Sequence, residues 1–113
     1  MINDTSNIVL MVNGIVGNST KLDFLQVGKS SYIIRVLNNK FRQQILKLLE
    51  GQNRLTVAEI YIQLRLEQSV ASQHLGVLRQ AGIVKTEREG KFIYYGLQHQ
   101  RIADINKRVL ELV

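Results

Sequence analysis

Residues 57–97 read VAEIYIQLRLEQSVASQHLGVLRQAGIVKTEREGKFIYYGL, and this stretch decides the fold. It predicts a short helix, a turn, a second helix with a polar face, and a hairpin around Glu89 and Gly90. A rigid polar helix beside a basic hairpin tip is an arrangement with which proteins read the edges of a DNA duplex. The pattern therefore favours double-stranded DNA as a partner.

The first helix begins at a capping signal. Thr56 and Glu59 have the spacing of a T-x-x-E capping box, whose hydroxyl and carboxylate satisfy backbone N–H groups at a helix start. We expect a helix over 57–64, with Val57, Ile60 and Leu64 turned inward. The following turn is formed by Arg65, Leu66 and Glu67.

The second helix, expected over 68–81, has two different sides. The apolar side consists of Ala71, Leu75 and Leu78, with Val77 at its margin. The polar side consists of Ser69, Ser72, Gln73 and Gly76. Gly82 suits the left-handed position after a helix, and Ile83 can make the hydrophobic contact that accompanies such a cap.

The polar side has the chemistry of a recognition helix. A glutamine pairs with adenine through N6 and N7, and a serine contacts bases or phosphates. The candidate DNA-binding residues on this helix are Gln68, Ser69, Ser72 and Gln73. The alternative is that they form only the solvated face of an ordinary helix.

The hairpin predicted from strands over 83–88 and 91–97 adds a cationic tip. Arg88 and Lys91 are its candidate contacts to the sugar-phosphate backbone or the minor groove. Glu87 and Glu89 dilute this charge, and charged hairpin tips also occur on proteins that bind no nucleic acid.

The composition supports the same class of partner. The chain has 113 residues, a formal net charge of +6 and a pI near 9.9, which favours a polyanion. It contains no cysteine, so disulfides and thiolate metal ligands are excluded. No stretch approaches the roughly 20 apolar residues of a membrane span. For a chain without cysteines, the expected location is the cytoplasm.

The remaining residues predict an extension and further helices. Residues 1–18 show no clear period and are expected to form a flexible or partner-packed extension, before a single domain over 19–113. A helical pattern over 21–37 includes Leu22 and Leu25, and residues 28–31, GKSS, could divide it into two helices. After a break at Asn38 and Asn39, an amphipathic helix over 41–49 stops at Gly51.

The C-terminal segment from His99 carries a helical apolar stripe. Its members are Ile102, Ile105, Val109 and Leu112. The sequence suggests no remaining element to cover this stripe, so we expect it to pair with its copy in a second subunit.

The segment SVASQHLGVLRQAGIV over 69–84 and the segment REGKFIYY over 88–95 resemble the signature of the ArsR/SmtB family of bacterial winged helix-turn-helix regulators. The resemblance extends from about residue 33 to residue 97. It implies a mainly α fold with a small β-hairpin, and a homodimeric repressor acting on an inverted repeat. It also implies a dimer interface in the terminal helices, here Leu22, Leu25, Ile102, Ile105, Val109 and Leu112.

The chain departs from this family at the known metal sites. One site uses cysteines where this chain has Thr56 and Ala58, with Tyr61 farther along. The other uses Asp and His residues of the last helix, where this chain offers His99, Arg101, Asp104, Glu111 and Leu112. One histidine beside an arginine suits zinc poorly, so we expect no metal and no cofactor. The effector, if one exists, is unknown.

Two other classes of function compete with a regulator. A winged helix that binds protein instead of DNA is compatible with the diluted hairpin charge. An enzyme is disfavoured, because His74 and His99 lie on different elements and no glycine-rich phosphate loop of the Walker type occurs.

Overall fold

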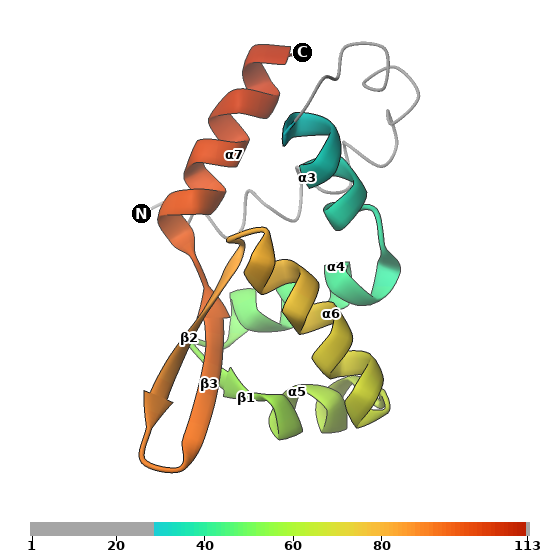
Figure 1. Cartoon of the computed structure of the whole chain (residues 1–113), viewed down its shortest axis with the longest axis vertical. Helices are drawn as coiled ribbons and strands as arrows, with labels where there is room; N and C mark the ends of the chain where they lie inside the picture. The colour runs from blue at the N-terminus through green and yellow to red at the C-terminus, as the bar shows by residue number, and fades with distance from the viewer. Residues whose placement is uncertain (1–28, 113) are drawn as a thin grey trace.

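The computed structural model describes residues 29–112 of the chain (Figure 1). The predicted extension over 1–18 and the predicted interface residues Leu22 and Leu25 lie outside this range. In chain order the elements are α3 (Lys29–Leu37), α4 (Lys40–Gly51), β1 (Leu55–Thr56), α5 (Val57–Leu64), α6 (Gln68–Gln80), β2 (Val84–Glu89), β3 (Phe92–Leu97) and α7 (His99–Leu112).

In this part of the chain the strands form an antiparallel sheet in the order β1-β3-β2. β2 and β3 are the predicted hairpin, called the wing below. β1 was not predicted, because two residues carry no recognisable alternation. It pairs with the far side of β3, Leu55 opposite Tyr95 and Thr56 opposite Tyr94. β1 thus ties the middle of β3 to α5, the helix that directly follows β1.

The helix-turn-helix unit, α5 and α6, begins where the sequence predicts. The Thr56 hydroxyl accepts a hydrogen bond from the Glu59 N–H at 3.2 Å, and the Glu59 carboxylate accepts one from the Thr56 N–H at 2.9 Å. This reciprocal pair is the predicted capping box, and it starts α5. At the other end, Arg65 adopts a left-handed φ of 56° and stops the helix.

The helices and the base of the sheet enclose one hydrophobic cluster. α4 and α5 contribute Ile45, Leu46, Leu49 and Ile60, and α6 contributes Leu75 and Leu78. Ile83, Val84 and Leu97 close it from the base of the wing. Burial of their apolar side chains in this cluster therefore fixes α5 and α6, the helix-turn-helix unit, to the rest of the fold.

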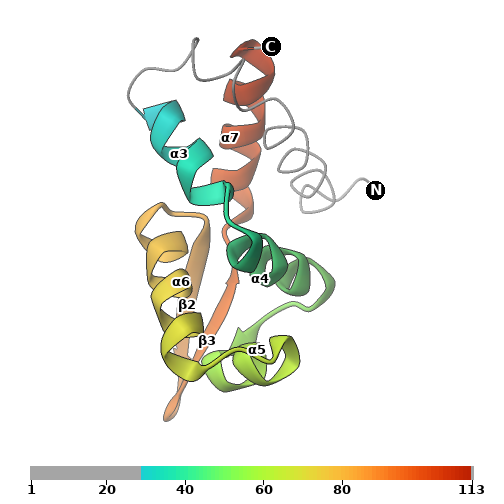
Figure 2. The same ribbon diagram turned by 90° about the vertical axis from the view of Figure 1, so that its right-hand side faces the viewer.

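The prediction that the C-terminal stripe lacks a cover within the chain is wrong for Ile102 and Ile105. Their exposed fractions are 0% and 4%, and they belong to the same cluster as the buried residues of α3. α3 lies beside α7 in both views (Figures 1 and 2). These two isoleucines are core residues. The side chains of Val109 and Leu112 lie outside the described part of the chain.

α6 ends in a Schellman motif at Gly82, which confirms the predicted glycine stop. The Gly82 N–H donates to the carbonyl of Arg79 at 2.9 Å, and the Ile83 N–H donates to the carbonyl of Leu78 at 3.0 Å. Gly82 has a φ of 78°, the left-handed conformation that such a motif needs. This turn leads directly from the recognition helix into β2.

Gly82→Ala is expected to lower the free energy of unfolding by about 1 to 2 kcal/mol, because an L residue is strained at this φ. The nearest atoms to an added Cβ belong to the Arg101 side chain, at 3.4 Å or more, so the cost lies in the backbone. Gly76→Ala is the matched control. Its Cβ meets nothing within 4 Å in the middle of α6, and it should add about 0.5 to 1 kcal/mol. Urea denaturation measures both, and effects of the same sign would contradict the assignment.

Candidate nucleic-acid interface

The two sides predicted for the second helix are present on α6. The exposed side chains of its first half are Gln68, Ser69, Ser72 and Gln73. On the opposite side Ala71, Leu75 and Leu78 are fully buried, each with an exposed fraction of 0%. A locked apolar back and a front of short polar side chains allow the helix to approach a groove closely. The predicted division into an inward and an outward side is confirmed.

The first turn of α6 leaves its backbone donors open. Glu67 stands at the N-cap, and its side chain makes no capping hydrogen bond. The first N–H groups of a helix have no intrahelical acceptor, and together with the helix dipole they attract phosphate. This end of α6 therefore suits the DNA backbone, while Ser72 and Gln73, one turn farther on, suit base edges.

His74 lies next to the polar front but turns toward α4. Its Nδ1 accepts a hydrogen bond from Nε of Arg42 at 3.2 Å, and its ring centroid lies 5.7 Å from that of Phe41. Arg42 also donates from Nη1 to the carbonyl of Val36 at 3.0 Å, in the last turn of α3. His74 therefore packs against α4, and Arg42, on α4, links α6 to α3 as well.

His74 makes the stability of the fold depend on pH. Burial lowers the pKa of His74 below its ordinary value, and the Arg42 cation lowers it further. The unfolded chain therefore binds a proton more readily than the folded one as the pH falls below about 6.5. The stability that neutral His74 contributes is present above that pH and is lost as the pH falls through the lower, folded-state pKa.

His74→Gln is expected to remove this part of the pH dependence, because an amide does not titrate in this range. Denaturant unfolding at pH values from 7.5 down to 5 measures it. The control His99→Gln removes the chain's other histidine and should keep the dependence. Identical pH profiles for wild type and His74→Gln would refute the assignment.

The wing tip, residues 88–91, carries the two predicted cations. Arg88 and Lys91 are exposed. Nε of Arg88 donates to the carbonyl of Gly90 at 3.2 Å, and Nζ of Lys91 lies 5.5 Å from the ring centroid of Phe92. Because Glu89 pairs with Phe92, the loop consists of Gly90 and Lys91, one residue later than the predicted turn. Gly90 supplies the left-handed residue, with a φ of 64°.

Arg54 contacts the wing near its tip, although no sequence pattern indicated this residue. It lies in the link between α4 and β1. Its Nη2 is 2.6 Å from Oε2 of Glu89, and its Cζ is 4.1 Å from the ring centroid of Tyr94. The hydrogen bond with Glu89 raises the pKa of the Arg54 guanidinium. Since the ion-pair partners are 35 positions apart, no local pattern connects them.

The outward front of α6 and the wing tip lie at one end of the described structure. Figures 1 and 2 both place α5, the N-terminal end of α6 and the hairpin tip at the lower end. α3 and the C-terminal end of α7 lie at the upper end in the same views. The N-terminal end of α6, whose exposed side chains are polar, and the wing tip with its two cations thus lie at the same end, away from the C-terminal end of α7.

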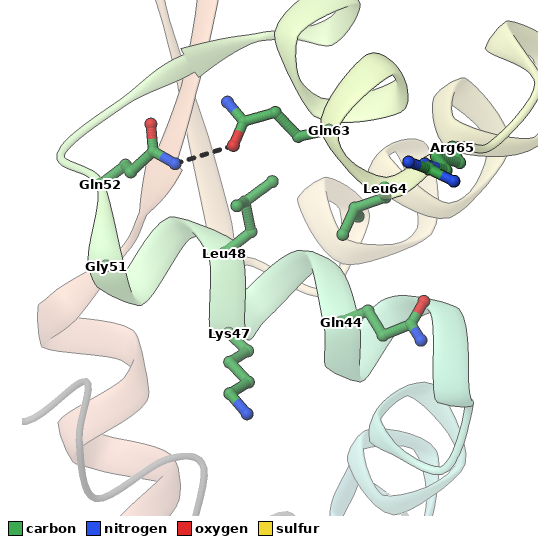
Figure 3. A pocket seen from close by; sticks show the side chains of 8 residues that line it. All are labelled: Gln44, Lys47, Leu48, Gly51, Gln52, Gln63, Leu64 and Arg65. Atoms are coloured by element: carbon green, nitrogen blue, oxygen red, sulfur yellow. Dashed lines mark hydrogen bonds between the residues drawn. The ribbon is translucent and has the colours of Figure 1, made fainter.

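A shallow groove of about 540 Å³ lies between α4 and α5 (Figure 3). Its wall at one side is closed by a hydrogen bond of 3.0 Å from Nε2 of Gln52 to Oε1 of Gln63. Leu48 and Leu64 point into the space between the helices, while Lys47 points away from α5. The lining residues are Gln44, Lys47, Leu48, Gly51, Gln52, Gln63, Leu64 and Arg65. None belongs to α6, so the groove is separate from the polar front.

The described residues meet the requirements of neither a metal site nor a membrane span. Within 29–112 no group of three or more His, Cys, Asp or Glu side chains is arranged to hold a metal ion. At the positions of the two family sites, Thr56 caps α5, and Asp104 accepts a hydrogen bond from Gln100 at 3.3 Å. No helix in this range is long and apolar enough to cross a membrane.

The capped α5, the left-handed turn, the two-sided α6 and the antiparallel wing define a winged helix-turn-helix, a class of DNA-binding protein. The chain belongs to the ArsR family within this class. Residues 39–86 match the family model described as "Bacterial regulatory protein, arsR family". An uncharacterized HTH-type transcriptional regulator of Methanocaldococcus jannaschii is 36% identical over 84 residues, which cover 74% of this chain and 94% of that protein. The family resemblance seen in residues 69–95 is confirmed.

Other relatives include both an activator and a repressor. The transcriptional activator HlyU of Vibrio cholerae is 35% identical over 85 residues, covering 75% of this chain and 74% of HlyU. The solved structure of reduced HlyU aligns with a TM-score of 0.59 over 80% of this chain and 92% of that one. The transcriptional repressor SdpR of Bacillus subtilis is 31% identical over 72 residues, which cover 64% of this chain and 79% of SdpR. This chain is thus a DNA-binding transcriptional regulator and not an enzyme.

Proposed function

We propose that this regulator is a homodimeric repressor of an inverted-repeat operator. In each subunit the first half of α6 enters the major groove with Gln68, Ser69, Ser72 and Gln73 toward the bases. Arg88 and Lys91 meet the sugar-phosphate backbone or the minor groove. The observation that carries this proposal is that the N-terminal end of α6 and the wing tip, which carry these exposed side chains, lie at the same end of the structure (Figure 1).

The dimer is proposed to form through the terminal segments. α3 and the C-terminal end of α7 lie at the end opposite the wing tip (Figure 2). A two-fold axis there leaves both DNA-facing ends free, with half-sites about 34 to 36 Å apart. Because Ile102 and Ile105 are core residues, the proposed interface residues are now Leu22, Leu25, Val109 and Leu112.

Repression then follows from occupancy. A dimer bound across a promoter excludes polymerase, and this needs no surface beyond the two DNA-facing ends. Since relatives include an activator and a repressor, transcription from a promoter that carries the selected operator decides the direction. We expect transcription to fall when the regulator is added.

Selection of bound DNA from a random pool tests the proposal. The expected product is an inverted repeat with half-sites one helical turn or a multiple apart, bound with a steep salt dependence. Light scattering of the free protein should give twice the 12.9 kDa mass of one chain. A single unrepeated site or a monomeric mass would overturn the dimer. Salt-insensitive binding to a protein partner with no selected DNA would favour the protein-binding alternative.

A further inference from the structure

The charge of the wing tip depends on a residue outside the wing. Residues 87–91 contain two carboxylates, Glu87 and Glu89, and two cations, Arg88 and Lys91, so their formal sum is zero. The guanidinium of Arg54 lies 2.6 Å from the Glu89 carboxylate and brings one further positive charge to this end of the hairpin. With Arg54 the group has a formal charge of +1.

Arg54 reaches the wing on one particular face. The register places Tyr94 opposite Thr56 of β1, and Glu89 opposite Phe92. Side chains two positions apart on a strand share a face, so Tyr94 and Glu89 project on the same side of the hairpin. Arg54, two positions before Thr56, extends along that side and contacts both: Tyr94 through its ring at 4.1 Å and Glu89 through its carboxylate.

The backbone that carries Arg54 is held against the wing. A Cβ on Gly96 would come within 3.3 Å of the carbonyl oxygen of Asn53, the residue before Arg54. The link between α4 and β1 therefore packs closely on β3. The Arg54 side chain has an exposed fraction of only 32%, compared with 64% for Glu89. The backbone of Arg54 is thus held in place, and its side chain forms the ion pair with the more exposed Glu89.

The outer end of the wing has little other support in the described residues. β1 pairs with β3 only at Tyr94 and Tyr95. Beyond them Phe92 and Ile93 are 50% and 47% exposed. The ion pair from Arg54 to Glu89 therefore connects the last cross-strand pair of the hairpin, Glu89 and Phe92, to the link before β1, and β1 leads directly into α5.

We propose that Arg54 is a positioning residue for DNA binding. It fixes the orientation of the wing tip relative to α6, and it cancels the charge of Glu89 so that Arg88 and Lys91 can approach phosphate. The inference rests on the proposed contact between the wing and DNA. An exposed ion pair contributes little to global stability, so the effect of Arg54 is expected in DNA binding and in the order of the wing.

The test compares Arg54→Ala, the double variant Arg54→Ala with Glu89→Gln, and Lys85→Ala. Lys85 is the matched control, because it is an exposed cation at the base of the same hairpin. Affinity for the selected operator is measured over a salt series, and hydrogen exchange of the amides of residues 88–93 is measured without DNA. Thermal unfolding checks that each variant is folded. Arg54→Lys keeps the charge without the planar group and serves if Arg54→Ala is unfolded.

Arg54→Ala should weaken binding by about ten-fold and lower the slope of log affinity against log salt by about 1 or more, as lost phosphate contacts do. Lys85→Ala should weaken binding by no more than about three-fold, since a distant surface charge is screened. The double variant restores the charge balance without the contact, so it should stay weaker than wild type. Exchange in the wing should be faster whenever Arg54 is replaced by alanine.

Three results would overturn the inference. Equal binding by Arg54→Ala and Lys85→Ala, with unchanged exchange, would show that Arg54 positions nothing. Wild-type affinity in the double variant would reduce its role to charge cancellation. If the wild-type protein selects no DNA, the proposed function is wrong. If hydrogen exchange of residues 88–93 is then also unchanged in Arg54→Ala, Arg54 does not position the wing either.

Discussion

Replacing both Ser72 and Gln73 with alanine is expected to weaken binding to the selected operator by about thirty-fold or more. A good side-chain contact to a base edge contributes about 1 to 3 kcal/mol of discrimination, and each 1.4 kcal/mol is a factor of ten. Both side chains are exposed, so their removal should leave the fold intact. Affinity for the operator and for an unrelated duplex, measured at one salt concentration, gives the loss of specificity.

Gln80→Ala provides the matched control for this double variant. Gln80 is also an exposed glutamine on α6, at its C-terminal end. Gln80 lies seven positions after Gln73, which is about 10 Å along the helix axis. We expect wild-type binding from Gln80→Ala. Retained operator preference in the double variant would show that the assigned face is the wrong one.

Leu75→Ala is expected to lower the free energy of unfolding by about 2 to 5 kcal/mol. Leu75 is fully buried and forms part of the apolar back that holds α6 against the core. Small domains have only about 5 to 15 kcal/mol of stability in total, so much of the variant population should be unfolded near physiological temperature. Thermal and denaturant unfolding measure the loss, and DNA binding should fall with the folded fraction.

The control for Leu75→Ala is Leu75→Met, which keeps the volume of the side chain. Such exchanges usually cost less than about 1.5 kcal/mol. If Leu75→Ala remained as stable as Leu75→Met, the buried back of α6 would not be what fixes the recognition helix.

Local signals were sufficient to predict the helix-turn-helix unit. Thr56 and Glu59 satisfy donors within three residues of each other, so the start of α5 can be read from the chain itself. Gly82 likewise marks the end of α6, since the motif needs a left-handed residue. The outward placement of Ser72 and Gln73 followed from helical periodicity alone. The DNA contacts of these residues remain a prediction.

Contacts between distant segments were not predictable from the same signals. The stripe with Ile102 and Ile105 showed an apolar face but not which element covers it, and α3 contributes to the cluster that buries both. β1 exists because Leu55 and Thr56 meet β3, whose residues come much later in the chain. In both cases the partner segment cannot be identified from the periodicity of apolar residues near the contact.

The charge near the wing tip was also not predictable from the sequence, because it depends on a residue distant in the chain. In the sequence the two negative charges of Glu87 and Glu89 balance the two positive charges of Arg88 and Lys91. This neutral sum is compatible with a wing that does not bind DNA. The fold brings Arg54 to Glu89 and changes the sum. An ion pair across 35 positions follows from the packing of the link on β3, which only the three-dimensional structure shows.

The most direct test of the recognition helix compares the DNA sequences selected from a random pool by the wild-type protein and by Gln73→Ala. If α6 reads bases through its exposed amide, both proteins should select an inverted repeat. The variant should then lose base preference at one symmetric position in each half-site. Identical preferences at every position would contradict the assignment of this face to DNA.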